Sequence, residues 1–93
     1  METSIRYNDR AAYAIVAASV VDMIFAHGTV RQKDRAEWEY QTSKMLAQCC
    51  GLDQSVEWLK FSICVGLNRD FPLAVTPAVV AAARSELHAA RAA

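Results

Sequence analysis

The sequence has no excess of charge of either sign, because ten lysines and arginines balance ten aspartates and glutamates. Proteins that bind DNA or RNA usually carry a basic excess, since neutralising backbone phosphates supplies much of their affinity. The same balance gives no attraction to an anionic membrane surface. We therefore expect no general binding to nucleic acid and no docking on membranes.

The chain also lacks an apolar run long enough to cross a membrane. Its longest run, residues 11–26, is interrupted by Ser19 and Asp22 and is shorter than the roughly 20 residues that a membrane span requires. The amino terminus carries Glu2 where a secretory signal would carry basic residues. These features predict a cytoplasmic protein.

Cysteine and histidine are few, and their spacing does not match common site types. Cys49, Cys50 and Cys64 are odd in number and two of them are adjacent, which indicates reduced, buried thiols and no disulfide framework. With His27 and His88 they form no Cys-x-x-Cys or His-x-x-x-His pair. Local spacing indicates no Ser-His-Asp or Cys-His grouping either. We predict no metal, no cofactor and no enzymatic activity.

Asp22 is the one ionisable residue inside the apolar run. A carboxylate buried there would need a partner or a shifted pKa, as catalytic acids and interface residues often show. The alternative is a solvent-facing strip, since Ser19 lies three residues before Asp22 and Ala18 and Ala26 lie four residues to either side. The pattern favours the solvent-facing position.

The chain does contain four helix-length segments with clear boundaries. The first is predicted over about 9–27, with Asn8 as N-cap and with Gly28 after the last turn, where it is able to take a left-handed conformation. This helix is apolar nearly all the way round, so we expect other helices, or a second copy of the chain, to enclose it.

The second helix is predicted over about 30–50. Thr29 and Gln32 have the spacing of a capping box, and Gly51 ends the segment. The side chains expected to face inward are Trp38, Thr42, Met45, Leu46 and Cys49.

The third helix is predicted over about 54–67, with Asp53 as its N-cap. Residues 59–65 alternate with period two and also fit a strand, but no other segment offers it a partner strand. The expected apolar seam consists of Val56, Leu59, Ile63 and Leu67. The fourth helix is predicted over about 77–91, with Thr76 as cap and Pro77 at its first position. The sequence thus predicts an all-α fold, a single domain over 1–93 built as a compact bundle of about four helices.

Two short stretches resemble known helical units. Residues 46–55, Leu-Ala-Gln-Cys-Cys-Gly-Leu-Asp-Gln-Ser, resemble the turn of phage-repressor-type helix-turn-helix domains. This resemblance implies a DNA-binding regulator that uses the region 43–62, although Glu57 and Lys60 stand where that pattern has apolar residues. Residues 26–30, Ala-His-Gly-Thr-Val, are similar to a turn in tellurite-resistance-type helical domains, in which His27 takes the place of an acid.

Aromatic residues among charged ones are the strongest functional signal in this chain. Trp38 and Tyr40 lie about 200° apart on a helix, so only one of them can face the core. Trp58 and Phe61 lie partly off the apolar seam of the third helix, and exposed aromatic residues beside arginine are typical of interface hot spots. The predicted partner-binding residues are Arg31, Arg35, Trp38, Glu39, Tyr40 and Trp58. On the last helix, Arg84, His88 and Arg91 share a face, which solvation and the helix dipole explain.

We therefore expect a small, non-enzymatic protein that binds a protein partner stoichiometrically. A homodimer through the first helix, or through the first and fourth, would cover the excess apolar surface. Small, neutral chains without a catalytic signature occur among phage and mobile-element inhibitors, including anti-defence proteins, and the size of this chain suggests that class. The alternative function is the helix-turn-helix regulator.

Overall fold

The computed structural model describes residues 4–5, 10–48 and 54–92. This part of the chain contains the helices α1 (Arg10–His27), α2 (Arg35–Gln48), α3 (Val56–Asp70) and α4 (Pro77–Ala92), and a short 3-10 helix η1 (Gln32–Asp34) before α2. The two-residue strands β1 (Ser4–Ile5) and β2 (Gln54–Ser55) pair in antiparallel orientation. The predicted all-α bundle of about four helices is confirmed, including a helix where residues 59–65 also fitted a strand.

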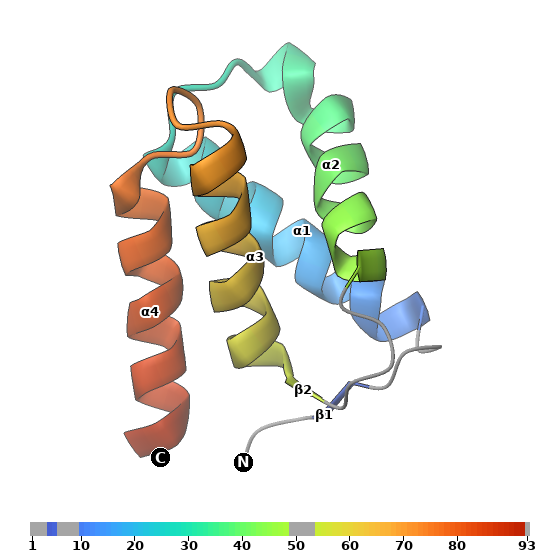
Figure 1. Ribbon diagram of the computed structural model, residues 1–93, viewed down its shortest axis with the longest axis vertical. Coiled ribbons are helices and arrows are strands. Elements are labelled where there is room, and N and C mark those ends of the chain that lie inside the picture. The colour runs from blue at the N-terminus through green and yellow to red at the C-terminus, as the bar shows by residue number, and fades with distance from the viewer. Residues whose placement is uncertain (1–3, 6–9, 49–53, 93) are drawn as a thin grey trace.

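The helices form two packed layers, as Figure 1 shows. α3 and α4 lie side by side and are joined by a short loop, α1 crosses behind them, and α2 packs on the other side of α3. α1 and α3 each contact the other three helices. The core therefore sits where α1 crosses α3.

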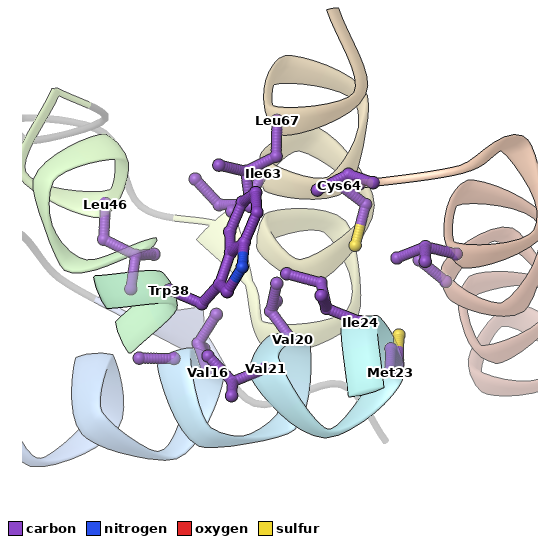
Figure 2. Close-up of a cluster of buried hydrophobic side chains, with 14 of the residues drawn as sticks. Val16, Val20, Val21, Met23, Ile24, Trp38, Leu46, Ile63, Cys64 and Leu67 are labelled. Carbon is purple, nitrogen blue, oxygen red and sulfur yellow. The ribbon is translucent and has the colours of Figure 1, made fainter. Parts of the chain in front are cut away.

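The buried side chains come mainly from the predicted apolar positions. Figure 2 shows Val16, Val20 and Ile24 of α1 pointing toward Ile63 and Leu67 of α3. Burying such a side chain contributes about 1.5–3 kcal/mol, so this cluster supplies a substantial part of the driving force for folding. Further residues buried in the core are Val21, Leu46, Leu59, Cys64, Val75, Val79, Ala83 and Leu87.

One strip of α1 stays exposed to solvent in the single chain. It consists of small residues together with Ile15, which is 62% exposed, and Asp22. The solvent-facing position predicted for Asp22 is therefore confirmed, and the helix is not enclosed on every side by its own chain.

The junction after α1 differs from the prediction. The Thr29 hydroxyl donates a hydrogen bond to the carbonyl of Leu73 and does not cap the next helix, while the Thr29 N–H donates to the Ala74 carbonyl at 3.1 Å. Arg31 consequently remains extended, with φ −97° and ψ 145°. The predicted start of the second helix at 30 is wrong, because α2 begins at Arg35 after η1.

Gly28 does not adopt the left-handed conformation that a glycine is able to take after the last turn of a helix. Its N–H still bonds to the Ile24 carbonyl at 2.7 Å, as a continuing helix would. A Cβ at this position would lie 2.5 Å from the Ile24 oxygen and 2.6 Å from the Ala74 oxygen. Glycine is therefore needed for a close approach between α1 and the loop that precedes α4.

The boundaries of α3 and α4 follow both local and distant hydrogen bonds. Ser55 is the N-cap of α3, and its hydroxyl accepts a hydrogen bond from the Trp58 N–H at 3.1 Å. α3 continues three residues past its predicted end, and the Asn68 side chain donates to the Val75 carbonyl at 2.6 Å. α4 begins at Pro77 as predicted, but the Thr76 hydroxyl donates to the His27 carbonyl at 2.9 Å.

Three predicted boundary residues and one predicted inward-facing residue lie outside the described residues, and the N-cap role predicted for Asp53 is wrong because Ser55 caps α3. Asn8 and Asp53 are the predicted N-caps of the first and third helices, and Gly51 is the predicted end of the second. Cys49 is the residue of the second helix that was expected to face inward.

Candidate functional site

The structure separates the two aromatic residues predicted on α2. Trp38 is buried, with 7% of its surface exposed, and its ring meets that of Phe71 edge-on at 5.2 Å between centroids. Tyr40 points outward and is 62% exposed. As the helical geometry required, only one of the two faces the core. Trp38 is therefore a core residue, and little of its side chain is exposed.

The charged residues predicted on the partner surface beside Trp38 bind within the chain. The Arg35 side chain donates to the Asp22 carboxylate and to the Glu39 carboxylate, both at 3.0 Å. These hydrogen bonds, first that of Asp22 and then that of Glu39, raise the pKa of Arg35 above its ordinary value. Arg31 lies 3.8 Å from Asp34. Arg35 and Glu39 thus link α2 to α1, although exposed ion pairs of this kind add little stability.

Trp58, the last of the predicted site residues, belongs to a different surface. Its ring is 39% exposed and meets the ring of Phe61 edge-on, with the centroids 5.8 Å apart. The guanidinium of Arg91 lies over Trp58 at 5.9 Å, and that of Arg84 lies over Phe61 at 5.4 Å. Both distances fall within the roughly 6 Å range of a cation–π contact. We call Trp58, Phe61, Arg84 and Arg91 the aromatic–arginine face.

Local features of α3 and α4 position this face. The Ser55 cap fixes the first turn of α3, so the backbone of Trp58 is held by a hydrogen bond. On the edge of the helix pair that faces α1, Lys60 donates to Glu86 at 2.9 Å and fixes how α3 and α4 align. The helix cap and the packing of α3 against α4 thus arrange the four side chains of the face within the single chain.

A cavity of about 290 Å³ lies on the edge that faces α1, between α1 and the α3–α4 pair. Its charged groups already have partners, because Asp22 binds Arg35 and Lys60 binds Glu86. A serine can act as a nucleophile when a neighbouring base such as a histidine accepts its proton. Ser19 and His27 both line the cavity, but no hydrogen bond joins them in the described part of the chain. The cavity is lined by Ser19, Asp22, Met23, Ala26, His27, Lys60 and Glu86. This arrangement supplies no activated nucleophile.

The described residues offer no obvious metal site and no membrane span. Within residues 4–5, 10–48 and 54–92, no three His, Cys, Asp or Glu side chains are grouped so that they could hold a metal ion. None of the helices in this part of the chain combines the length and apolar character needed to span a bilayer. Cys49 and Cys50 lie outside these residues.

Cys64 is buried on α3, and burial raises the pKa of its thiol to about 12 from an ordinary value of 9.0. We predict that Cys64 of the folded protein resists alkylation by iodoacetamide at pH 8, because its reactive thiolate is scarce and shielded. Peptide-resolved mass spectrometry measures this, with the urea-unfolded chain as the control. Equal labelling of Cys64 in both states would contradict the prediction.

The same thiol links stability to pH. The folded state keeps the Cys64 proton that the unfolded chain releases near pH 9, so the folded state binds more protons there. The contribution of this group to the free energy of unfolding is complete below pH 9 and is lost as pH rises toward about 12.

The helix-turn-helix alternative would use α3 as the recognition helix. Its connecting turn falls within 49–53, outside the described residues. Ser55 is engaged as a helix cap and Lys60 is paired with Glu86, so neither polar side chain is free to read a base. α3 also contacts all three other helices, which leaves only one side of it open.

Sequence reasoning found the parts of the aromatic–arginine face and missed their assembly. The spacing of Trp58 and Phe61, and separately of Arg84 and Arg91, places each pair on one side of a helix. Only the packing of α3 against α4 brings the two pairs together. No protein family matches this chain, and no curated protein or solved structure matches it either.

Proposed function

We propose that this chain is a non-enzymatic binding protein that engages a protein partner stoichiometrically through the aromatic–arginine face. The observation that carries the proposal is a partly exposed tryptophan held between a second aromatic ring and an arginine. Tryptophan and arginine are the residues most enriched in interface hot spots. Because their side chains are already packed against one another, binding costs less conformational entropy.

The region around Tyr40 is a weaker candidate than this face. Tyr40 is exposed, but neighbouring Arg35 and Glu39 bind each other and Asp22. Trp58 is accompanied by two arginines and by Val65, which is also exposed on α3. The size of the chain suggests an inhibitor. The chain would inhibit its partner if this face covers the partner's own active or binding site.

A photo-crosslinking amino acid placed at Val65, which is exposed on the same helix as Trp58, tests the proposal and identifies the partner while leaving Trp58 in place. We expect a discrete crosslinked species whose mass equals one chain plus one partner, and none when the same group replaces exposed Tyr40. With the purified partner, Trp58→Ala should weaken binding about 30-fold or more. Tyr40→Ala, the matched control, should change the dissociation constant by less than about twofold.

Equal binding by Trp58→Ala and the unaltered chain would disprove the proposed surface. Binding to duplex DNA that weakens steeply with salt would support the helix-turn-helix alternative instead. Light scattering on the free chain and on the complex gives the stoichiometry. It also shows whether the free chain forms the homodimer that would be needed to cover the exposed strip of α1 around Ile15.

A further inference from the structure

We infer that the aromatic–arginine face recognises an acidic amphipathic helix of the partner. Two carboxylates of this helix bind Arg84 and Arg91, and an apolar side chain between them packs against Trp58. The inference rests on the proposed function and adds the chemistry of the partner. It comes from a difference between the arginines of this face and the other arginines of the chain.

The arginines whose side chains the structure describes fall into two groups. Arg31, Arg35 and Arg69 each lie within 4 Å of a carboxylate, at 3.8, 3.0 and 3.3 Å. Arg84 and Arg91 have no such contact with any described residue, and each lies over an aromatic ring. The two unpaired arginines of this set are therefore both in the same face.

Arg35 is an example within this chain of an arginine that contacts both an aromatic ring and carboxylates. Its guanidinium lies over the ring of Phe25 at 5.8 Å and at the same time donates to Asp22 and Glu39. One guanidinium can thus contact a ring with its flat side and carboxylates with its N–H edges. At Arg84 and Arg91 the described chain provides the ring but no carboxylate, so their N–H edges are open to water or to the carboxylates of a partner.

The geometry favours carboxylates over the bases of a single-stranded nucleic acid. Bases bind by stacking on open aromatic faces, whereas guanidinium groups already lie over the rings of Trp58 and Phe61. The chain also has no basic excess that would attract a phosphate backbone. What remains open on this face is the N–H edges of the two arginines, the exposed side chain of His88 between them on α4, and part of the Trp58 ring.

The spacing of the two arginines indicates the conformation of the partner. Arg91 follows Arg84 by seven positions on α4, so their Cα atoms are about 10 Å apart. A partner helix that packs alongside α4 matches this distance when two of its acidic residues are also seven positions apart. An apolar residue three or four positions after the first acidic residue then lies on the same side of that helix. In an extended strand, residues on one side lie about 7 or 13 Å apart, which does not match.

The probe for this inference is a 22-residue alanine-rich helical peptide with two glutamates seven apart and one leucine between them. Its control carries glutamine in place of both glutamates. Fluorescence anisotropy should show about fivefold weaker binding for each glutamate lost and about 25-fold for both, if the two contacts are additive. In the double variant Arg84→Gln/Arg91→Gln, we expect both peptides to bind equally weakly.

A second control peptide places the glutamates five residues apart, on different sides of the helix, and should bind like the glutamine peptide. Equal binding of the glutamate and glutamine peptides would overturn the acidic-helix inference. If both then lose binding with Trp58→Ala, the proposed binding surface still stands. No binding of either peptide, or preferential binding of oligothymidine, would also overturn the inference, while the crosslink from Val65 decides the proposed function separately.

Discussion

Trp38→Ala is expected to destabilise the protein by about 3–5 kcal/mol, the usual cost of removing a buried aromatic side chain. Figure 2 shows the indole ring standing between α2 and α3, beside Ile63 and Leu67. Its edge-on contact with Phe71 also fixes the end of α3. Because a domain of this size has a total stability of about 5–10 kcal/mol, the melting temperature should fall by roughly 15 °C or more.

Thermal unfolding followed by circular dichroism measures this effect. Tyr40→Ala is the matched control, because it removes an aromatic side chain two residues away on the exposed side of α2 and should change stability by less than about 0.5 kcal/mol. If the two variants unfolded at the same temperature, Trp38 would not be a core residue. Its predicted place in the partner-binding surface would then have to be reconsidered.

The sequence was most informative where local signals and hydrophobic periodicity agreed. Pro77 marks the start of α4, because proline at the first helical position lacks only an N–H that would be unpaired anyway. Leu59, Ile63 and Leu67 fix both the helical character of α3 and its buried side. α1 was recognised from its long apolar run, and its end at His27 was predicted correctly.

Local signals failed where a polar side chain bonds to a distant part of the chain. Thr29 was expected to cap the second helix, and Thr76 the fourth. Both hydroxyls instead donate to backbone carbonyls more than forty residues away in the sequence. A capping pattern describes only the nearest residues, so it cannot show that a tertiary partner competes for the same hydroxyl.

For the same reason, the sequence predicts the residues of the candidate site on each helix but not the contacts between helices. Arg35 was assigned to a partner surface because its tertiary partner, Asp22, is thirteen residues away on another helix. Trp58 was found as an exposed aromatic residue, but its contact with Arg91 depends on how α3 packs against α4. Spacing along one helix shows which residues share a side, whereas the contact between two helices has to be seen in the fold.

Gly28→Ala should have the other large effect, a loss of about 3 kcal/mol in the free energy of unfolding. The new Cβ would lie 2.5 and 2.6 Å from the backbone oxygens of Ile24 and Ala74. Backbone cannot rotate away as a side chain can, so α1 and the loop before α4 have to separate. Overpacking of this kind costs about 1–3 kcal/mol. The hydrogen bond between Thr29 and Ala74 would also weaken, at a cost of about 1 kcal/mol.

Gly66→Ala is the matched control for this prediction, because Gly66 lies inside α3 and its added Cβ would meet only the Met45 side chain, at 3.1 and 3.3 Å. Methionine is flexible enough to move by a few tenths of an ångström. Alanine also favours a helix interior over glycine by about 1 kcal/mol. Gly66→Ala should therefore be neutral or stabilising in urea unfolding. Equal stability of the two variants would mean that α1 and the loop do not approach closely at Gly28, and that the loop does not hold α4 against α1.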